Sequence, residues 1–387
     1  MSEHAVAEYA EAVRRRYAIA SRVDKGRILD EFCATTGMHR KAAIRLLNRS
    51  PGPAAERRGR PRRYGPEFAA ALVDLWQLSD RMCGKLLAAV MADLVDALAR
   101  HDEVRLPPEL RGQLLEVSPA TIDRVISRHR KRAGVQPQRR SPSSGLKAEI
   151  PVRTWSDWGG TPVGSLQADL VLHCGESTEG FYLTTLCAVD VATGWTELQP
   201  VWGLGKQRVG TAVHLIRQRL PFELRSLHTD NGSEFINHTL VNWCRKEGIH
   251  VTRGRSYRKN DQAYVEQRNW QTVRRTVGYD RLTSKRAYAL LEQLYPLVSQ
   301  QLNYFRPVRK LEAKDRVGAR VRKSYDQPRT SCQRLLESGQ LTPAQALDLQ
   351  GARSDINPAE LRRKIDRILR ELWQLGRQDA MLTEDAG

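Results

Sequence analysis

The chain of 387 residues lacks the features of membrane proteins and of disulfide-stabilised proteins. No apolar run approaches the roughly 20 residues that a membrane-spanning helix needs, and the first residues do not have the form of a signal peptide. The six cysteines lie singly, without a Cys-x-x-Cys pair, so neither a disulfide framework nor a zinc knuckle is indicated. We therefore expect a protein of the reducing cytoplasm with no membrane partner.

Negative charge is scarce in this sequence. There are 63 Lys and Arg residues against 44 Asp and Glu residues, which gives a formal net charge of +19. Such an excess indicates a polyanionic partner, and double-stranded DNA is the first candidate. An acidic membrane surface is the competing candidate, and the absence of a long apolar run weakens it. Double-stranded DNA is therefore the favoured partner.

Three of the few carboxylates lie where strands or helices would project them toward one another. Asp169 is in an alternating, strand-like run at 165–174, on the face opposite Leu166 and Ala168. Asp230 follows a second strand-like run and precedes an Asn-Gly turn. Glu266 lies early in a helix that Asn260 or Asp261 could cap. Its helical neighbours predict that Glu266 faces the protein rather than the solvent.

This set of carboxylates has the chemistry of a two-metal site. Mg²⁺ and Mn²⁺ prefer hard oxygen ligands, and two such ions can hold the attacking and leaving oxygens of a displacement at phosphorus. Without metal the three like charges would repel one another and raise at least one pKa. We therefore expect Asp169, Asp230 and Glu266 to be both the catalytic residues and the ligands of two Mg²⁺ or Mn²⁺ ions.

Two phrases around these carboxylates resemble known proteins. The phrase His-Thr-Asp-Asn-Gly-Ser-Glu-Phe at 228–235, with 35 residues between Asp230 and Glu266, is similar to the DDE catalytic core of retroviral integrases. The phrase Tyr-Arg-Lys-Asn-Asp-Gln-Ala-Tyr-Val-Glu-Gln-Arg-Asn at 257–269 is closer still to transposases of bacterial insertion sequences with an integrase-type core. The resemblance covers roughly 156–305. The zinc-binding domain of retroviral integrases has no counterpart here, because its His/Cys pattern is missing.

Structural explanations compete with the catalytic one at individual positions. An Asp at a strand end is often a structural cap, so Asp230 alone leaves both roles open. Asp190 ends an apolar run and precedes Ala-Thr-Gly, which favours a cap on a hairpin turn. Glu234 is too near Asp230 in sequence to complete a triad.

The pattern of elements predicts several domains: all-α helix-turn-helix modules, a central α/β core with a mixed five-stranded sheet, and a basic C-terminal region with a terminal helix. The resemblance implies that the core is RNase H-like. The expected segments are a helix-turn-helix domain at 1–50, a basic linker resembling an AT-hook at 51–66, a second helix-turn-helix-like domain at 67–130, a basic linker at 131–155, the catalytic core at 156–305 and the basic C-terminal region at 306–387.

Basic residues in these segments are candidates for DNA contacts. The candidates are Arg40, Lys41 and Arg45 in the first helical domain, Arg60 and Arg62 in the AT-hook-like linker, Arg124 and Arg128 in the second helical domain, Arg258, Lys259 and Asn260 before Glu266, and Arg322 and Lys323 in the C-terminal region. The alternatives are an ordinary helical hairpin for the first helical domain, a flexible tether for the AT-hook-like linker and a solvated basic loop for the C-terminal region.

The resemblance implies a DNA transposase. Such an enzyme binds the terminal inverted repeats of an insertion sequence, hydrolyses the element ends to free 3′-hydroxyls, and joins these to target DNA by two-metal transesterification. Joining two ends requires a homo-oligomer, a dimer or larger, assembled on DNA. Two alternatives remain: a non-catalytic, sequence-specific DNA-binding regulator, and an RNase H-like metal-dependent endonuclease that cuts without joining.

Overall fold

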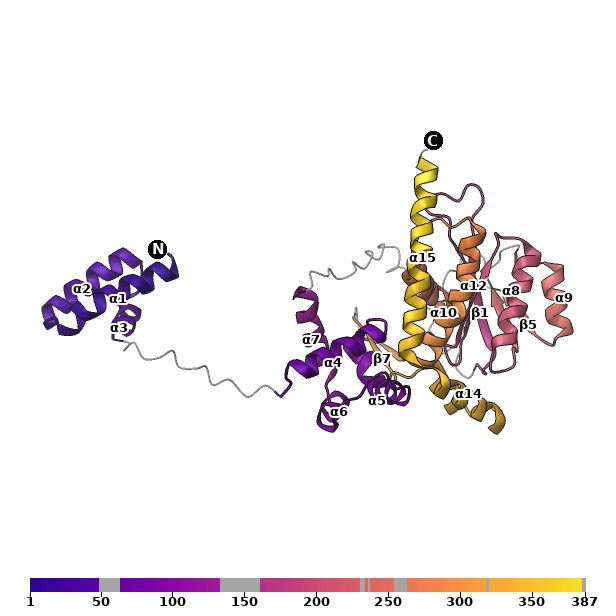
Figure 1. Ribbon diagram of the computed structural model, residues 1–387, viewed down its shortest axis with the longest axis horizontal. Coiled ribbons are helices and arrows are strands. Elements are labelled where there is room, and N and C mark those ends of the chain that lie inside the picture. Colours follow the sequence, from indigo (N-terminus) through magenta and orange to yellow (C-terminus); the bar gives the residue numbers. More distant parts are fainter. Residues whose placement is uncertain are drawn as a thin grey trace. The chain divides into compact units, whose positions relative to one another are not determined.

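The computed structural model describes residues 1–48, 63–132, 161–229, 234–235, 237–253, 263–317 and 320–384. Two units are distinguished, residues 1–63 and residues 64–387 (Figure 1). None of the helices in these described ranges combines the length and apolar character needed to cross a membrane. The domain boundaries expected from the sequence remain predictions.

The first unit is a small three-helix domain. Its helices are α1 (Glu3–Ile19), α2 (Arg22–Thr36) and α3 (Arg40–Leu47). Helix α2 ends at Gly37, whose φ of 71° is a left-handed conformation that glycine adopts at little cost. Phe32 is fully buried at the centre, and its ring stacks on Tyr9 with centroids 5.2 Å apart. A turn that contains Gly37 joins α2 to the basic helix α3, and the role of these helices as a helix-turn-helix stays a prediction.

The second unit begins with a helical module, residues 64–132. It consists of α4 (Pro66–Leu78), α5 (Gly84–Arg100), α6 (Pro108–Leu115) and α7 (Pro119–Arg132). Gly84 lies so close to α7 that a Cβ atom there would be 2.3 Å from the Pro119 carbonyl oxygen. The Gly84 amide donates to Asp123 Oδ1 at 2.7 Å, which fixes the start of α5 against α7.

A mixed five-stranded sheet forms the centre of the second unit. Its strands are β1 (Ser165–Leu172), β2 (Thr184–Asp190), β3 (Thr196–Val201), β4 (Ser226–Thr229) and β5 (His250–Arg253). The strand order is β3-β2-β1-β4-β5, with β1 antiparallel to β2 and parallel to β4. The predicted five-stranded mixed sheet is confirmed, and each strand lies within a few residues of its expected position.

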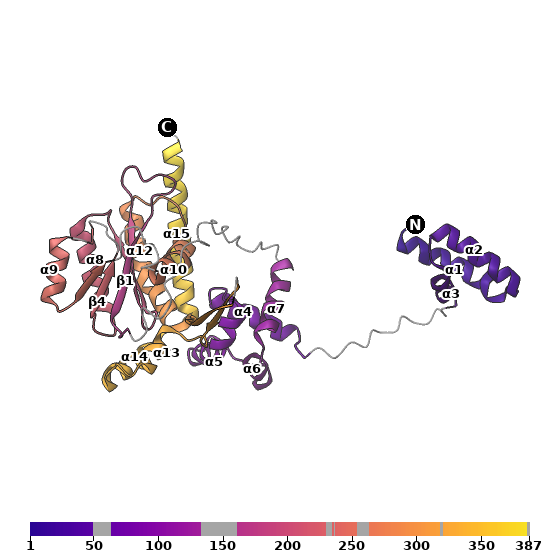
Figure 2. The same ribbon diagram turned by 180° about the vertical axis from the view of Figure 1, so that it is seen from behind.

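Helices cover both faces of the sheet (Figures 1 and 2). One face packs on α8 (Lys206–Arg219) and α9 (His238–Lys246), through the side of β1 that carries Leu166 and Ala168. The other face, which carries Val171, packs on helices that follow β5. These are α10 (Ala263–Arg268), the π-helix η4 (Asn269–Arg274), α11 (Arg275–Val277), α12 (Lys285–Gln300) and the π-helix η5 (Gln301–Phe305).

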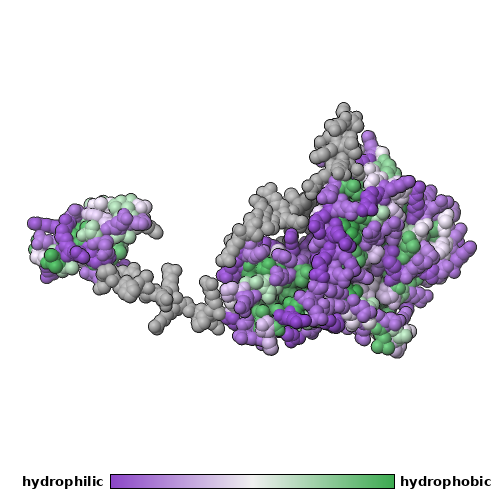
Figure 3. Space-filling model, viewed as in Figure 1, coloured by the Kyte–Doolittle hydropathy of each residue, from purple (hydrophilic) through white to green (hydrophobic). Residues whose placement is uncertain are grey.

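The C-terminal region packs against the apolar clusters on both faces of the sheet. It contains the ribbon β6 (Leu311–Val317) and β7 (Arg320–Tyr325), then α13 (Ser331–Glu337), α14 (Pro343–Asp355) and α15 (Pro358–Glu384). Helix α15 buries the predicted apolar stripe that includes Leu361, Ile365 and Leu372, and it packs along α12. Its opposite face is hydrophilic over most of the helix in the view of Figure 3. The predicted terminal helix is therefore confirmed.

Candidate active site

Asp169 lies in the middle of the central strand β1. Its backbone is paired with Cys187 of β2, and its side chain belongs to the face covered by α10 and α12. The residues of β1 before it are buried, whereas Asp169 is half-buried. A carboxylate inside an apolar strand is unfavourable unless polar groups stabilise it, so the partners of Asp169 define the site.

Asn269 provides one of these partners from the helix opposite. Its Nδ2 donates to Asp169 Oδ2 at 2.7 Å, and the Leu170 amide donates to Asp169 Oδ1 at 2.9 Å. The other polar atom of the amide, Asn269 Oδ1, is buried and has no hydrogen-bond donor among the described residues. A buried acceptor oxygen beside a carboxylate is suited to a cation or to water bound by a cation.

Gln167 fixes the start of the same helix. Its side chain is fully buried, and its Oε1 accepts hydrogen bonds from the amides of Tyr264 at 3.2 Å and Val265 at 3.3 Å. These amides belong to the first turn of α10, where backbone donors have no partner within the helix. The side chain two residues before Asp169 thus holds the turn that immediately precedes Glu266.

Glu266 is on the first turns of this helix and is exposed to solvent. The prediction that it faces the protein is wrong. The buried side of the helix carries Val265 and Arg268, whereas Trp270, one turn after Glu266, is 50% exposed. The sequence pattern grouped Trp270 with the inward residues, but the helix turns its apolar side toward β2. Glu266 therefore lies at the open edge of the site, where a large substrate can reach it.

The helix changes its winding at the site. The π-helix η4 starts at Asn269, the residue that contacts Asp169, and continues to Arg274. π-Helical turns are rare in proteins as a whole, but those that occur are often at functional sites. The wider turn begins one residue after the buried Arg268, whose Nη2 donates to the Gly194 carbonyl at 3.2 Å. Burial, together with the charge of Arg306, lowers the pKa of Arg268 to about 10.

The third predicted ligand, Asp230, lies outside the described residues. Strand β4 ends at Thr229, and its parallel register with β1 pairs Gln167 with His228. Also outside the described residues are the DNA-binding candidates Arg60, Arg62, Arg258, Lys259 and Asn260. Within the described ranges no group of three or more His, Cys, Asp or Glu side chains could hold a metal ion, and the predicted triad includes a residue beyond those ranges.

The donors that are described fit a hard divalent cation. Asp169 supplies carboxylate oxygens, Asn269 supplies an amide oxygen without a donor, and Glu266 supplies an exposed carboxylate one helical turn before Asn269. The neighbouring thiol does not compete as a ligand. Burial raises the pKa of Cys187, and the charge of Asp169 raises it further, so this group stays protonated at neutral pH.

Asp190 has the structural role expected for it. Its side chain is fully buried at the end of β2, and Oδ2 accepts from the amide and the hydroxyl of Thr193 at 2.8 and 2.7 Å. Oδ1 accepts from the amides of Gly164 and Ser165 at 2.9 and 3.1 Å. All four bonds fix the β2–β3 turn and the start of β1, which confirms the hairpin-cap interpretation.

Two residues of the site were not predicted. Asn269 was placed on the helix face of Glu266 by spacing, but its bond to Asp169 depends on how the helix packs on β1. Gln167 was placed on the face of Asp169 by alternation, and a polar residue at a core position was the signal that could have identified it. Each joins β1 to the helix through one side-chain amide.

The remaining DNA-binding candidates lie on exposed surfaces. Lys41 and Arg45 are exposed on α3, and Arg40 is paired with Asp30 of α2. Arg124 and Arg128 are on the exposed side of α7, and Arg322 and Lys323 are exposed on β7. Their contacts with DNA stay predictions.

Comparisons with known proteins agree with this geometry. Residues 161–259 match the family model of the integrase core domain. The chain is 46% identical over 322 residues to the uncharacterized protein y4rM of Sinorhizobium fredii (strain NBRC 101917 / NGR234), over 83% of this chain and 92% of that protein. A structure of the catalytic core domain of BIV integrase matches with 23% identity and a TM-score of 0.27, covering 37% of this chain and 85% of that one. The chain therefore belongs to the same family as the Sinorhizobium protein, and its residues 161–259, which contain the central sheet, match the integrase core domain.

Proposed function

We propose that the protein is a DNA transposase. It binds the terminal inverted repeats of an insertion sequence, hydrolyses the element ends to free 3′-hydroxyls, and joins these ends to target DNA. The observation that carries the proposal is the link between β1 and the helix of Glu266, made by the contact of Asn269 with Asp169. That contact joins the strand of Asp169 to the helix that carries Glu266, and the match to the integrase core domain supports a shared site for the two carboxylates.

Catalytic cores of this type generally use divalent metal ions. Two bound ions would supply Lewis-acid stabilisation of the charge that develops on the phosphate in transit. The chain would hold them through Asp169, Asp230 and Glu266. Asn269 keeps one oxygen of Asp169 oriented, and Gln167 fixes the helix turn before Glu266. The protein would contribute mainly by orientation and electrostatics, since no covalent intermediate is needed.

DNA recognition in this proposal is divided among separate surfaces. Helix α3 and helix α7 would read the element ends through Lys41, Arg45, Arg124 and Arg128, with Arg40 close by. Two such readers on one chain suit a long, bipartite site. Because two element ends must be joined, the active form would be a homo-oligomer assembled on DNA.

The basic ribbon β6–β7 would add a further DNA contact. Both faces of β7 from Val321 to Tyr325 are exposed, and Arg322 lies opposite Asp315 while Lys323 is on the other face. A free two-stranded ribbon is marginally stable alone, and its width suits the major groove. We expect the double variant Arg322→Ala with Lys323→Ala to lower the slope of log affinity against log salt by about 2, because each lost phosphate contact contributes about 0.9.

A matched pair on α15 controls for net charge. Lys364 and Arg367 are exposed on the hydrophilic side of that helix, so the variant Lys364→Ala with Arg367→Ala removes the same charge. DNA affinity titrated over a range of salt concentrations should keep the wild-type slope in this control. Equal slopes for the two double variants would reject the ribbon as a DNA contact.

Asn269→Ala is expected to weaken catalysis without weakening end binding. Removing the amide leaves Asp169 Oδ2 without its donor, and the loss of an outer partner of a metal ligand typically costs about 10–100-fold in metal affinity or activity. Strand joining measured at increasing Mn²⁺ concentration gives both the metal affinity and the activity. Gln267→Ala, at an exposed position of the same helix, serves as the control. Wild-type Mn²⁺ dependence in Asn269→Ala would remove this residue from the site.

Strand joining tests the proposed function itself. The DNA that flanks the gene of this protein is supplied as short labelled duplexes with a supercoiled plasmid and Mg²⁺. A transposase yields labelled ends joined to plasmid. Cutting without joining would establish the endonuclease alternative. Binding with neither reaction, in Mg²⁺ and in Mn²⁺, would establish the DNA-binding regulator.

A further inference from the structure

The helix that carries Glu266 and Asn269 is held at both ends. We call residues 263–277, which comprise α10, η4 and α11, the catalytic helix. At its start, Gln167 of β1 accepts hydrogen bonds from two of its amides. At its other end, Arg275 reaches the helical module, and the Trp373 indole donates to the Val277 carbonyl at 3.2 Å. The contacts at the second end thus come from outside the integrase core.

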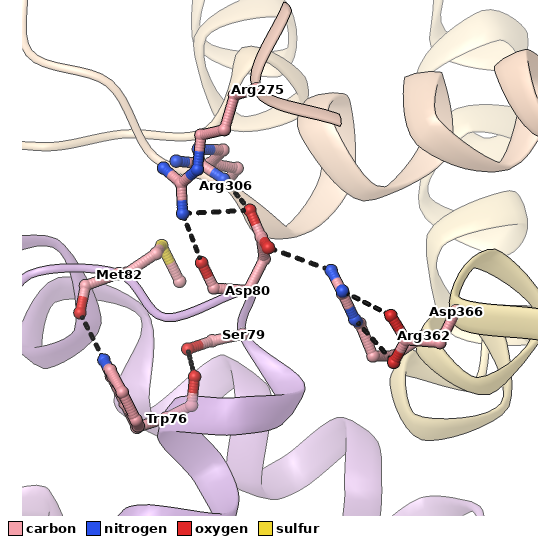
Figure 4. Close-up of polar contacts among 8 residues, drawn as sticks. All are labelled: Trp76, Ser79, Asp80, Met82, Arg275, Arg306, Arg362 and Asp366. Carbon is pink, nitrogen blue, oxygen red and sulfur yellow. Dashed lines mark hydrogen bonds and ion pairs between the residues drawn. The ribbon is translucent and has the colours of Figure 1, made fainter. Parts of the chain in front are cut away.

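The contact with the helical module is made by Asp80, at the tip of the turn between α4 and α5 (Figure 4). Asp80 and Arg81 have φ angles of 57° and 56°, a left-handed conformation that side chains other than glycine adopt infrequently. Several hydrogen bonds fix the turn, and three of them involve Trp76. They are Arg81 N to the Trp76 carbonyl at 2.9 Å, Trp76 Nε1 to the Met82 carbonyl at 3.0 Å, and Ser79 Oγ to the Trp76 carbonyl at 2.9 Å.

Three arginines from three separate segments that follow the sheet converge on this one carboxylate (Figure 4). Arg306, after η5, lies 2.5 Å from Oδ2, and Arg362 of α15 donates to Oδ1 at 2.9 Å. Arg275 of the catalytic helix lies 3.4 Å from Oδ2 and also donates to the Asp80 carbonyl at 2.9 Å. The side chains of the four residues are at most 30% exposed. Shielding from solvent makes such pairs stronger than surface ion pairs.

Other acidic residues of the helical module contact different elements. Asp93 pairs with Arg353 of α14 at 2.6 Å and accepts from Gln333 of α13 at 3.0 Å. Glu103 pairs with Arg363 of α15 at 2.6 Å. Asp93 therefore stabilises the same interface as Asp80 without touching the catalytic helix, which makes it a matched reference.

The π-helix lies between the two fixed ends. Gln167 holds residues 264 and 265, Asp80 holds residue 275, and η4 occupies 269–274. A π-turn has an extra residue per hydrogen-bonded ring and a less favourable geometry than an α-turn. A displacement of Arg275 can therefore be absorbed by rewinding this segment. Rewinding would move Asn269, the first residue of η4, relative to Asp169.

We propose that Asp80 is a positioning residue that couples the helical module to the catalytic helix. When Asp80 is paired with Arg275, Arg275 is fixed and Asn269 is placed to bond Asp169. When that pair is broken, the helix can shift and Asn269 loses this position. DNA binding on α7 would then act on the active site through the rigid turn of Asp80. The consequence for strand joining rests on the proposed function, whereas the effect on the catalytic helix does not.

Hydrogen exchange of the full-length protein without DNA tests the coupling. Asp80→Asn is the suitable variant, because asparagine keeps the shape and tolerates the left-handed conformation. Exchange of the amides at 263–277 should become faster by on the order of tenfold. Asp93→Asn should leave exchange in this segment unchanged. No acceleration in Asp80→Asn, or an equal one in Asp93→Asn, would overturn the proposal.

A metal titration separates positioning from general destabilisation. Asp80→Asn should raise the Mn²⁺ concentration at half-saturation several-fold, measured by direct binding, while Asp93→Asn keeps the wild-type value. If Asp80→Asn does not fold, Arg275→Gln removes the same pair from the other side, with Arg353→Gln as its control. Wild-type Mn²⁺ binding in Arg275→Gln would reject the coupling. The two proposals can also fail separately. If the wild-type protein joins no DNA but Asp80→Asn still shows the expected changes in hydrogen exchange and Mn²⁺ binding, the transposase proposal is refuted and the coupling proposal stands.

Discussion

Glu266→Gln should bind DNA ends as the wild-type protein does and join none of them. The substitution keeps the shape of the side chain but removes a negative charge from an exposed position one helical turn before Asn269, which contacts Asp169. A neutral amide is a weaker ligand for a hard divalent cation than a carboxylate. We expect strand joining to fall by at least roughly 10²–10³-fold, the scale on which removal of one transition-state stabiliser acts.

End binding and joining are measured on the same labelled duplexes. Glu176→Gln, which changes an exposed carboxylate in the loop after β1, should retain both activities. Loss of end binding by Glu266→Gln would contradict the division of labour between reading helices and catalytic core. Joining by Glu266→Gln at the wild-type rate would remove Glu266 from the triad.

The same variant should not lower the stability of the fold. Glu266 is exposed, and substitutions at exposed positions usually change the free energy of unfolding by less than about 0.5 kcal/mol. In the absence of metal, removing one of several neighbouring like charges is expected to be neutral or stabilising. If the Glu266→Gln protein is inactive but keeps the wild-type Tm, its defect therefore lies in the reaction and not in the fold.

Asp190→Ala should have the opposite profile and destabilise the protein severely. The side chain is fully buried and accepts four hydrogen bonds, from the amides of Gly164, Ser165 and Thr193 and from the Thr193 hydroxyl. Alanine would leave these buried donors unsatisfied, at about 1–3 kcal/mol each if none finds water. We expect the free energy of unfolding to fall by about 3 kcal/mol or more.

Denaturant unfolding of the variants gives this value directly. Asp348→Ala, an exposed carboxylate on α14, is the reference and should change stability little. A stable but inactive Asp190→Ala protein would indicate that Asp190 has a role in the reaction. The structural role of Asp190 and the catalytic role of Asp169 would then both have to be reassigned.

The strands of the sheet were predictable because each is indicated by the pattern of residues within its own short segment. Alternation in β1 and the short apolar run of β2 indicate strands within a window of a few residues. Strand β6 and helices α13 and α14 were not expected. The sequence of β6 alternates charge rather than hydrophobicity, and it pairs only with β7.

The candidate site was predictable in part. Spacing and the phrases around Asp230 and Glu266 predicted the carboxylates, whose catalytic role stays a prediction, and alternation predicted the face of β1 that carries Asp169. The exposure of Glu266 depends on how the helix is rotated against β2, which periodicity left ambiguous because Trp270 was counted as an inward residue. The contacts of Asp80 join residues about 195–282 positions apart and carry no local signal.

Manganese binding to the full-length protein without DNA tests the central claim most directly, since it needs no knowledge of the element ends. The claim is that Asp169 and the helix of Glu266 form one metal site. Mn²⁺ titration followed by electron paramagnetic resonance should show binding to the wild-type protein. Asp169→Asn and Glu266→Gln should each weaken it by at least about tenfold, while Glu176→Gln keeps the wild-type affinity. Unchanged Mn²⁺ binding in both Asp169→Asn and Glu266→Gln would contradict the account.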